Sequence, residues 1–505
     1  MILDEDGGIR AFASVETPSI FNRLGPGWVE HDAEEIWRAL CAASRLAMEK
    51  LEDPAHKIDA IGITTYRQTV LPLDADCRPI RLAIPWAVKA TTRQSEWIRE
   101  HIGEGTLHNI SGVNSDPHWA AATFRYLIEE EPEVYRKAYK LVGIQDFLLW
   151  RLGSSDVVID VGQASAISLL DIRKREWSRQ VCDVIGVSLE KLPRVVEPGT
   201  VVGSISKSAA EQTGFAEGTP LVVGGGDCQC SAVGCGAIQQ GTASVIIGTS
   251  AVGIVFSNEP VFDPRHKLVC HNHSYPQSYM MQHTLLTGGS AYRWFRDLLY
   301  PEKGGDESSL GVSRYPKMNE EVLKSPVGAH GLVFLPHFVG AASPYWNDRA
   351  RGVFIGADMS TSREDLGRAL IEGVVLELAK GFSLIESLGK TAPEVRLCGG
   401  PCQPGSPWNQ IQADAYGKPV LVNASGDTTS IGAAILAGAA VGVFSTVEEG
   451  VSRMVRFAET LQPDPRKHEK YQKLQRFHDA LYHALDDAGI YARHHDLVRE
   501  LYDVQ

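Results

Sequence analysis

The chain has 505 residues, of which 44% are hydrophobic and 22% charged, and its net charge is −13. This length exceeds what one compact core supports, so we expect two large globular domains without long disordered linkers. The acidic balance, with basic residues scattered among acids, argues against nucleic acid as a partner, and no apolar stretch approaches the roughly 20 residues of a membrane span.

The chain alternates helix and strand signals. An amphipathic helix is expected over residues 32–48, with Asp32 as its N-terminal cap and two acids in its first turn. Apolar runs predict strands at 58–64, 70–73, 221–223, 244–247 and 395–398, and helical character is expected at 132–152, 363–388 and 430–440. The pattern is mixed α/β throughout, and it restarts near residues 237–242. We therefore predict domains at 1–238 and 239–505.

Three predicted strands run directly into glycine, in segments 222–227, 246–250 and 397–400. A glycine after a strand lets backbone N–H groups approach a bound anion. One such turn is more often a simple tight turn, but one of these carries Asp227 and another carries Thr249 and Ser250. Phosphoryl transfer needs a phosphate cradle, a metal and a residue that orients the attacking hydroxyl. Asp227 fits the last role, although a helix N-cap is the structural alternative.

Other phosphate and metal motifs do not match. None of the glycine turns has the Gly-x4-Gly-Lys-Ser/Thr pattern of a P-loop, and the protein-kinase His-Arg-Asp loop is absent. Cys228, Cys230 and Cys235 lack the second ligand pair of a zinc site, so we interpret them as small buried side chains and expect no protein metal cluster. Nine cysteines without a compact framework, and an acidic start unlike a signal peptide, favour a cytoplasmic protein.

Several segments resemble the FGGY carbohydrate kinases, a family that includes glycerol kinase, xylulokinase and autoinducer-2 kinase. The similar segments are 25–32 with 35–37, 224–227, 248–250, 287–290 with 294–295, 344–346 with 349–352, 399–400, and 408–414 with 419–420. This resemblance covers nearly the whole chain. It implies an α/β fold of two actin-like (ribonuclease H-like) domains with a cleft between them, the sugar on the first domain and ATP mainly on the second.

The resemblance also implies roles for particular residues. Asp227 corresponds to the general base, or to a group that only aims the attacking hydroxyl. The positions implied to face ATP, which would bind with Mg²⁺, are Gly248, Thr249, Ser250, Gly288, Gly399 and Gly400. A small sugar or polyol is the implied partner, and a homodimer is expected from the family alone.

The acceptor side combines features of different family members. Arg67 and Gln68 fall where glycerol kinase carries the Arg-Glu pair that contacts substrate hydroxyls, and xylulokinases carry Met-His there. The resemblance places Trp86 against the substrate carbon chain, and His118 beside it together with Trp119. Gln229, two residues after Asp227, is more similar to autoinducer-2 kinase. A small linear polyol or ketose with a terminal hydroxyl is favoured.

The family begins with a strand and an Asp-x-Gly-Thr-Thr turn, whereas residues 2–8 are similar to the second strand and its hairpin. The first strand and phosphate loop are therefore expected to be missing, which would leave a central strand unpaired and weaken phosphate and metal placement. A mis-assigned start or a truncated chain is preferred to a chain that has lost catalysis, because the other sites look intact.

Three functions remain open from the sequence. The leading interpretation is an ATP-dependent sugar or polyol kinase. The alternatives are a catalytically impaired sugar- or nucleotide-binding protein of the same fold, supported by the missing loop, and an actin- or chaperone-like ATPase, which the pair Arg67-Gln68 disfavours.

Overall fold

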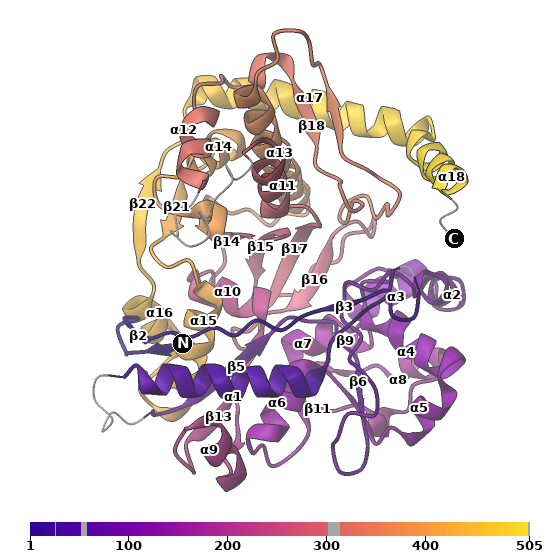
Figure 1. Cartoon of the computed structure of the whole chain (residues 1–505), viewed down its shortest axis with the longest axis vertical. Helices are drawn as coiled ribbons and strands as arrows, with labels where there is room; N and C mark the ends of the chain where they lie inside the picture. Colours follow the sequence, from indigo (N-terminus) through magenta and orange to yellow (C-terminus); the bar gives the residue numbers. More distant parts are fainter. Residues whose placement is uncertain (26, 52–57, 301–313, 503–505) are drawn as a thin grey trace. The chain divides into compact units, whose positions relative to one another are not determined.

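The computed structural model describes residues 1–25, 27–51, 58–300 and 314–502, so Pro26 of the first FGGY-like segment lies outside the described residues. Contacts divide the chain into two compact units. The first unit consists of residues 1–239, 256–281 and 427–455, and the second of 240–255, 282–426 and 456–505. The first unit thus takes two segments from beyond the predicted domain boundary, and the elements of both units are labelled in Figure 1.

The first unit is mixed α/β. Its helices are α1 (Ala33–Glu49), α2 (Thr92–Ile102), α3 (Glu104–Ser111), α4 (Ala120–Glu130), α5 (Pro132–Lys137), α6 (Ile144–Leu152), α7 (Val161–Ser165), α8 (Arg179–Ile185), α9 (Lys207–Thr213), α10 (Asp227–Gly234), α15 (Thr428–Val441) and α16 (Val447–Met454). Its strands are β1 (Ile2–Leu3), β2 (Ile9–Ala11), β3 (Ile20–Phe21), β4 (Val29–Glu30), β5 (Ile61–Thr65), β6 (Leu71–Leu73), β7 (Lys140–Val142), β8 (Val158–Asp160), β9 (Leu170–Asp171), β10 (Glu176–Trp177), β11 (Arg194–Val196), β12 (Val201–Ser204) and β13 (Pro220–Gly226).

A three-stranded sheet in the order β12-β13-β5 supports the first unit. β13 runs parallel to β5 and antiparallel to β12. Helix α15 packs directly on this sheet, because a Cβ on Gly62 would lie 2.6 Å from the Ala433 carbonyl oxygen. Within the described residues β5 has a strand partner on one side only, and the expectation of a missing neighbouring strand stays a prediction.

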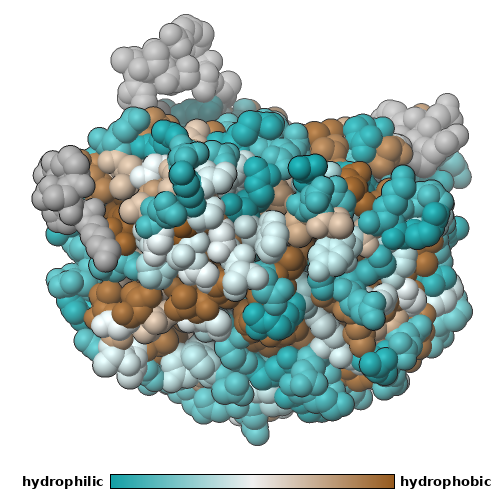
Figure 2. Space-filling model, turned by 90° about the horizontal axis from the view of Figure 1, so that it is seen from below, coloured by the Kyte–Doolittle hydropathy of each residue, from teal (hydrophilic) through white to brown (hydrophobic). Residues whose placement is uncertain are grey.

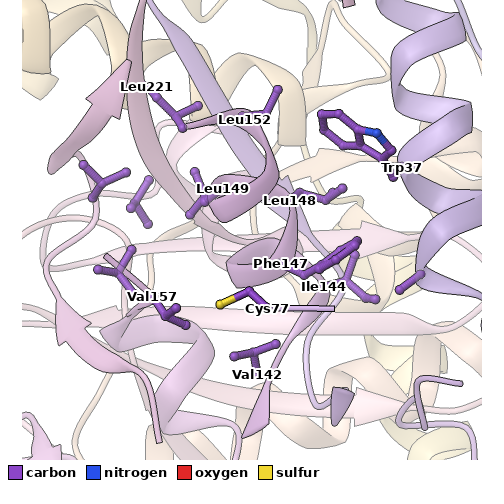
Figure 3. Close-up of a cluster of buried hydrophobic side chains, with 14 of the residues drawn as sticks. Trp37, Cys77, Val142, Ile144, Phe147, Leu148, Leu149, Leu152, Val157 and Leu221 are labelled. Carbon is purple, nitrogen blue, oxygen red and sulfur yellow. The ribbon is translucent and has the colours of Figure 1, made fainter. Parts of the chain in front are cut away.

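The core of the first unit gathers around helix α6 (Figure 3). Phe147, Leu149 and Leu152 are fully buried there, and Trp37 reaches them from α1. Burial of such side chains contributes about 1.5–3 kcal/mol each relative to exposure. The helix that sequence periodicity predicted at 32–48 is confirmed as α1, and the Asp32 carboxylate caps it by accepting from the N–H groups of Glu34 and Glu35.

A seven-stranded sheet in the order β16-β17-β15-β14-β20-β21-β22 contains most strands of the second unit, and its strand β16 lies in residues 256–281 of the first unit. Its strands are β14 (Thr242–Ile247), β15 (Ala251–Ser257), β16 (Val269–Asn272), β17 (Tyr279–Leu285), β20 (Glu394–Cys398), β21 (Val420–Asn423) and β22 (Phe457–Leu461). β14, β20 and β21 are parallel neighbours, so their carboxyl ends meet at one edge. A separate hairpin consists of β18 (Val333–Leu335) and β19 (Val353–Ile355).

Helices surround this sheet. They are α11 (Gly289–Leu299), α12 (Tyr315–Val322), α13 (Arg363–Ser387), α14 (Pro407–Tyr416), α17 (Pro465–Asp487) and α18 (Ile490–Tyr502), and short 3₁₀ turns are η1 (Leu189–Lys191) in the first unit and η3 (Ala329–Gly331) and η4 (Gly400–Cys402) in the second. The long helix predicted at 363–388 is confirmed as α13, and most of its residues are buried.

One predicted helical segment was wrong in detail. Residues 132–152 form two helices, α5 and α6, separated by strand β7, which pairs with β6. Leu141 and Val142 are buried in this pairing, so tertiary contacts override the local helical character.

Among the described helices, none is both long enough and apolar enough to cross a bilayer. On the face drawn in Figure 2, hydrophobic side chains form small groups separated by hydrophilic ones, as is usual for globular proteins.

A buried carboxylate ties the FGGY-like segment at 25–32 to the rest of the first unit. Glu30 is fully buried, and its oxygens accept from Arg23 at 2.7 Å and from Arg81 at 2.6 Å. Burial alone would raise the pKa of Glu30, but these two guanidinium groups hold it below its ordinary value. Arg81 also donates to Glu131 at 2.6 Å, which makes Glu30 the centre of a four-residue network.

Replacing this central carboxylate tests its structural role. Glu30→Gln should lower the free energy of unfolding by about 3 kcal/mol, because it removes the fully buried carboxylate that pairs with Arg81 and leaves that arginine with Glu131 as its remaining acidic partner. Denaturant titration measures this. The control Glu96→Gln changes an exposed acid on α2 and should stay within about 0.5 kcal/mol of the parent. Equal stability of the two variants would contradict the role assigned to Glu30.

Candidate functional site

Asp227 stands where a buried strand becomes a helix. The glycine triplet predicted as a turn is instead the end of β13, and Gly226 is the N-cap of α10, so Asp227 is the first helical residue. Its Oδ1 accepts from the N–H of Cys228 at 2.7 Å. Its side chain keeps 42% of its surface exposed, although the glycines before it are buried. The carboxylate is therefore held at its base and open at its tip.

Arg67 lies against this carboxylate. Its side chain is only 6% exposed, and its Nε is 3.5 Å from Asp227 Oδ1. A Cβ on Gly226 would come within 2.8 Å of Arg67 Cδ and 2.5 Å of Gln229 Oε1. Glycine at 226 is thus required so that the arginine can lie across the backbone and reach the acid.

The loop after β5 holds Arg67 and Gln68 in place. Gln68 has φ = 59°, in the left-handed region that a non-glycine residue adopts only when its surroundings impose it. The amide of Gln163 on α7 donates to the Thr65 carbonyl at 3.2 Å and to Thr65 Oγ1 at 3.1 Å. Tyr66 is hydrogen-bonded to His31 Nδ1 at 2.6 Å, and burial raises the pKa of its phenol. These contacts fix the loop from both sides.

Helix α7 in turn rests on buried acids. Asp160 caps it by accepting from the N–H of Gln163 at 3.0 Å, and also accepts from the Gln145 amide at 2.9 Å. Burial raises the pKa of Asp160 to about 6 and that of the neighbouring Asp146 to about 8. Asp160 thus supports the loop after β5 indirectly, by fixing the helix that carries Gln163. The sequence analysis did not identify these buried acids.

An aromatic group forms another part of the first unit's site. The rings of Trp86 and His118 stack with centroids 6.1 Å apart and planes 19° apart, and 36% of Trp86 is exposed. His118 Nδ1 is 2.5 Å from Asp116 Oδ1. Trp119 is buried and packs edge-on against His271, with centroids 5.6 Å apart.

His271 connects this aromatic group to Arg67, and sequence reasoning missed it. It is fully buried on β16, and Ser165 Oγ lies 3.5 Å from its Nδ1. Burial, reinforced by the charge of Arg67, holds its pKa far below the ordinary value. The sequence around His271 has two further histidines, His266 and His273, and no motif distinguishes one from another, because only the fold brings His271 near Arg67.

Gln229 takes a different position from the other predicted acceptor-side residues. It is fully buried, and its amide donates to the carbonyl oxygen of Gly162 at 3.1 Å. In this arrangement it links α10 to α7. Its contact with an acceptor stays a prediction.

The six positions expected to face ATP lie together in the second unit. Gly288 N–H donates to Thr249 O at 2.9 Å and Gly289 N–H to Gly248 O at 2.8 Å, which joins the 248–250 turn to the start of α11. A Cβ on Gly288 would lie 2.4 Å from the Ser250 backbone.

The parallel neighbour β20 brings the other two positions to the same edge. Gly399 has φ = 104°, and a Cβ there would lie 2.1 Å from Ile247 O. A Cβ on Gly248 or Gly400 would meet nothing within 4 Å, so the space above them is open. The result is a backbone-lined turn at a helix N-terminus, an arrangement suited to anions.

The described side chains do not build a dedicated metal cage. Among residues 1–25, 27–51, 58–300 and 314–502, no three His, Cys, Asp or Glu side chains gather at one point. Mg²⁺ bound to a nucleotide usually keeps its waters and phosphate oxygens and needs only one or two carboxylates, so binding of a metal–nucleotide complex does not require such a cage.

Family models match most of the chain. Residues 1–234 match the N-terminal domain, and residues 243–441 the C-terminal domain, of the FGGY family of carbohydrate kinases. The chain belongs to this family. It is an ATP-dependent kinase that phosphorylates a hydroxyl of a small sugar or polyol.

Individual relatives agree with the assignment. The chain is 27% identical over 480 residues to xylulose kinase of Bacillus subtilis, covering 94% of this chain and 92% of that protein. It is 28% identical over 485 residues to autoinducer-2 kinase of Escherichia coli K12, covering 94% and 89%. The crystal structure of xylulose kinase from Lactobacillus acidophilus superimposes with a TM-score of 0.86 at 22% identity, covering 97% and 96%. Plasmodium falciparum glycerol kinase with ADP gives 0.82 at 22% identity, covering 96% and 95%.

These structures confirm the predicted fold class, a mixed α/β protein of the two-domain, actin-like kind. Because both structural matches lie below 25% identity, they establish the fold and leave the acceptor undefined. The acceptor must be inferred from the site's own residues.

The glycine under Arg67 provides a test of the site. Gly226→Ala should lower kcat/KM for the acceptor by about a hundredfold, because the added methyl would lie 2.8 Å from Arg67 Cδ and 2.5 Å from Gln229 Oε1 and must displace both side chains. Gly105→Ala in helix α3 is the control, since its Cβ would be 3.4 Å from the nearest atom and alanine favours a helix. Steady-state kinetics with melting curves measures both. An active Gly226→Ala enzyme would contradict the required close approach.

Proposed function

We propose that the acceptor is a small, uncharged ketose or open-chain polyol. It is phosphorylated on a terminal hydroxyl that donates a hydrogen bond to Asp227. The observation that carries this proposal is the partly exposed Asp227 carboxylate beside the buried Arg67 guanidinium. A hydroxyl that donates to Asp227 Oδ is aimed at the phosphoryl group and can pass its proton to the carboxylate as the new O–P bond forms.

Arg67 has a positioning function in this proposal. It fixes the direction of the Asp227 carboxylate through the 3.5 Å contact and places a positive charge beside the hydroxyl that Asp227 would bind. Gln68, held in its unusual backbone conformation beside Arg67, can both donate and accept. Such groups reject an acceptor that lacks the matching hydroxyl, because they would be left unpaired.

Trp86 and His118 provide the less polar side of the acceptor site. The exposed face of the Trp86 indole suits the C–H surface of a short carbon chain, and the stacked His118 adds one polar group at its edge. In this proposal the acceptor site has a polar side at Arg67 and Asp227 and an apolar side at Trp86, as a sugar or polyol requires.

The second unit's turn is proposed to hold the nucleotide. The N-terminus of α11 and the backbone of the 248–250 turn suit the terminal phosphates, and Gly399 with Gly400 suits the α-phosphate and adenosine. Mg²⁺ would supply charge neutralisation for the phosphates. A cytoplasmic homodimer completes the proposal, and family resemblance alone supports it.

Acceptor-dependent turnover tests the proposal. ADP release with Mg-ATP should appear with a member of a panel of ketoses and polyols, and Asp227→Asn should lower kcat by about 10²- to 10⁴-fold by removing the group that takes the hydroxyl proton. Asp183→Asn, on an exposed position of α8, is the matched control and should keep full activity. Silence of the folded protein across the panel would instead favour a sugar- or nucleotide-binding protein, and acceptor-independent ADP release would favour an ATPase.

The nucleotide assignment makes a separate prediction. Gly288→Ala should raise the KM for ATP about tenfold or more and leave the KM for the acceptor little changed, because the added methyl pushes on the Ser250 backbone. Gly253→Ala on β15 is the control, with 3.4 Å available to Phe382. A rise confined to the acceptor KM would contradict the assignment of this turn.

A further inference from the structure

His118 is held by a carboxylate that no motif indicated. Asp116 Oδ1 lies 2.5 Å from His118 Nδ1 and also accepts from the His118 backbone N–H at 3.0 Å. The Trp119 N–H closes the turn by donating to the Asp116 carbonyl at 3.1 Å. The turn thus fixes both the backbone and the ring of His118.

The surroundings of Asp116 keep it ionised. Burial alone would raise the pKa of Asp116, but its contacts with His118 and the nearby charge of Arg99 hold it below the ordinary value. Arg99 on α2 donates to the Ser115 carbonyl at 2.9 Å and is 3.3 Å from Glu104 on α3. An ionised Asp116 can only accept, so Nδ1 of His118 must carry a proton.

The other ring nitrogen is left for a ligand. Among the described residues Nε2 of His118 has no hydrogen-bond partner. It is also not among the unpartnered polar atoms that are fully buried, so a ligand can reach it. The ring stacks on Trp86, which is itself 36% exposed. When Nδ1 holds the proton of a neutral imidazole, Nε2 presents a lone pair and accepts a hydrogen bond.

We propose that Asp116 is a positioning residue that sets the His118 tautomer, so that Nε2 accepts from a hydroxyl of the acceptor. The inference rests on the proposed function, which identifies the ligand as the acceptor. It adds which chemical group the acceptor carries at the end that lies along Trp86. That end carries a hydroxyl and no carboxylate.

The electrostatics of the pair explain this selectivity. A carboxylate at that end of the acceptor would face the lone pair of His118 Nε2 and could not accept a hydrogen bond from it. The Asp116 carboxylate lies on the other side of the same ring, and repulsion between the two negative charges would disfavour binding. A hydroxyl would satisfy Nε2 at no such cost. The pair therefore selects ketoses and polyols over aldonic acids of the same length.

The tautomer can be measured without any acceptor. In protein labelled with nitrogen-15 histidine, long-range couplings assign the proton to Nδ1 or Nε2, and His118→Gln identifies the relevant signals. At pH 8 the parent should show Nδ1 protonated, Asp116→Ala should move the proton toward Nε2, and Asp116→Glu should restore the parent pattern. A parent ring protonated on Nε2, or an unchanged pattern in Asp116→Ala, would overturn the proposal.

Kinetics tests the selectivity. With the neutral acceptor found in the panel, Asp116→Ala should raise its KM about tenfold, leave kcat within about twofold and leave the KM for ATP unchanged. The preference for this acceptor over the aldonic acid of equal length should fall by at least the same factor. Asp74→Ala is the matched control, because Asp74 caps a similar turn by accepting from Asp76 and Arg78 N–H groups and contacts no histidine.

The outcomes separate the two proposals. Loss of kcat together with a lower melting temperature in Asp116→Ala, or an unchanged preference between the two acceptors, would assign Asp116 a purely structural role and overturn the inference. If no acceptor is phosphorylated by the parent, the proposed function fails, and the histidine spectra still decide whether Asp116 sets the tautomer.

Discussion

The candidate acceptor site depends on one ion pair of unequal exposure. Arg67 is almost wholly buried and Asp227 is nearly half exposed, so the arginine is the fixed anchor and the acid is the accessible group. A buried guanidinium is costly unless it is partnered, and its carboxylate partner also stands at the start of a helix, where negative charge is favoured. The close approach over Gly226 exists because this pair must form.

The neighbours of Arg67 are consistent with that constraint. His271 is close enough to feel the charge of Arg67, and burial together with that charge holds the pKa of His271 far below its ordinary value. The loop that carries Arg67 is held by Gln163, whose helix is capped by the buried Asp160. The groups that support this loop are therefore an amide, a buried carboxyl group and a neutral imidazole.

The sequence predicted the elements and the acid, and it missed the supporting groups. Periodicity located α1 and α13, and the glycine triplet before Asp227 pointed to close backbone approach, although it proved to be strand rather than turn. These signals are local, so they can be read along the chain. Asp116 contacts His118 only two residues away, but an Asp-x-His spacing matches no known motif and its hydrogen bond appears only in the folded turn. His271 is brought to Trp119 from a distant strand, and no local pattern reports such a contact.

Family motifs also mix structural residues with functional ones. Tyr345, in one of the similar segments, stacks on Tyr482 at 3.6 Å and donates to the buried Glu377 at 3.1 Å, and burial raises the pKa of Glu377 to about 7. Glu30 in another segment is likewise a buried hub. Residues of this kind hold the fold, whereas acceptor choice must come from residues that can reach the acceptor. It should therefore be sought in the turn around Asp116 and His118, where a single carboxylate decides whether the histidine offers a lone pair or a proton.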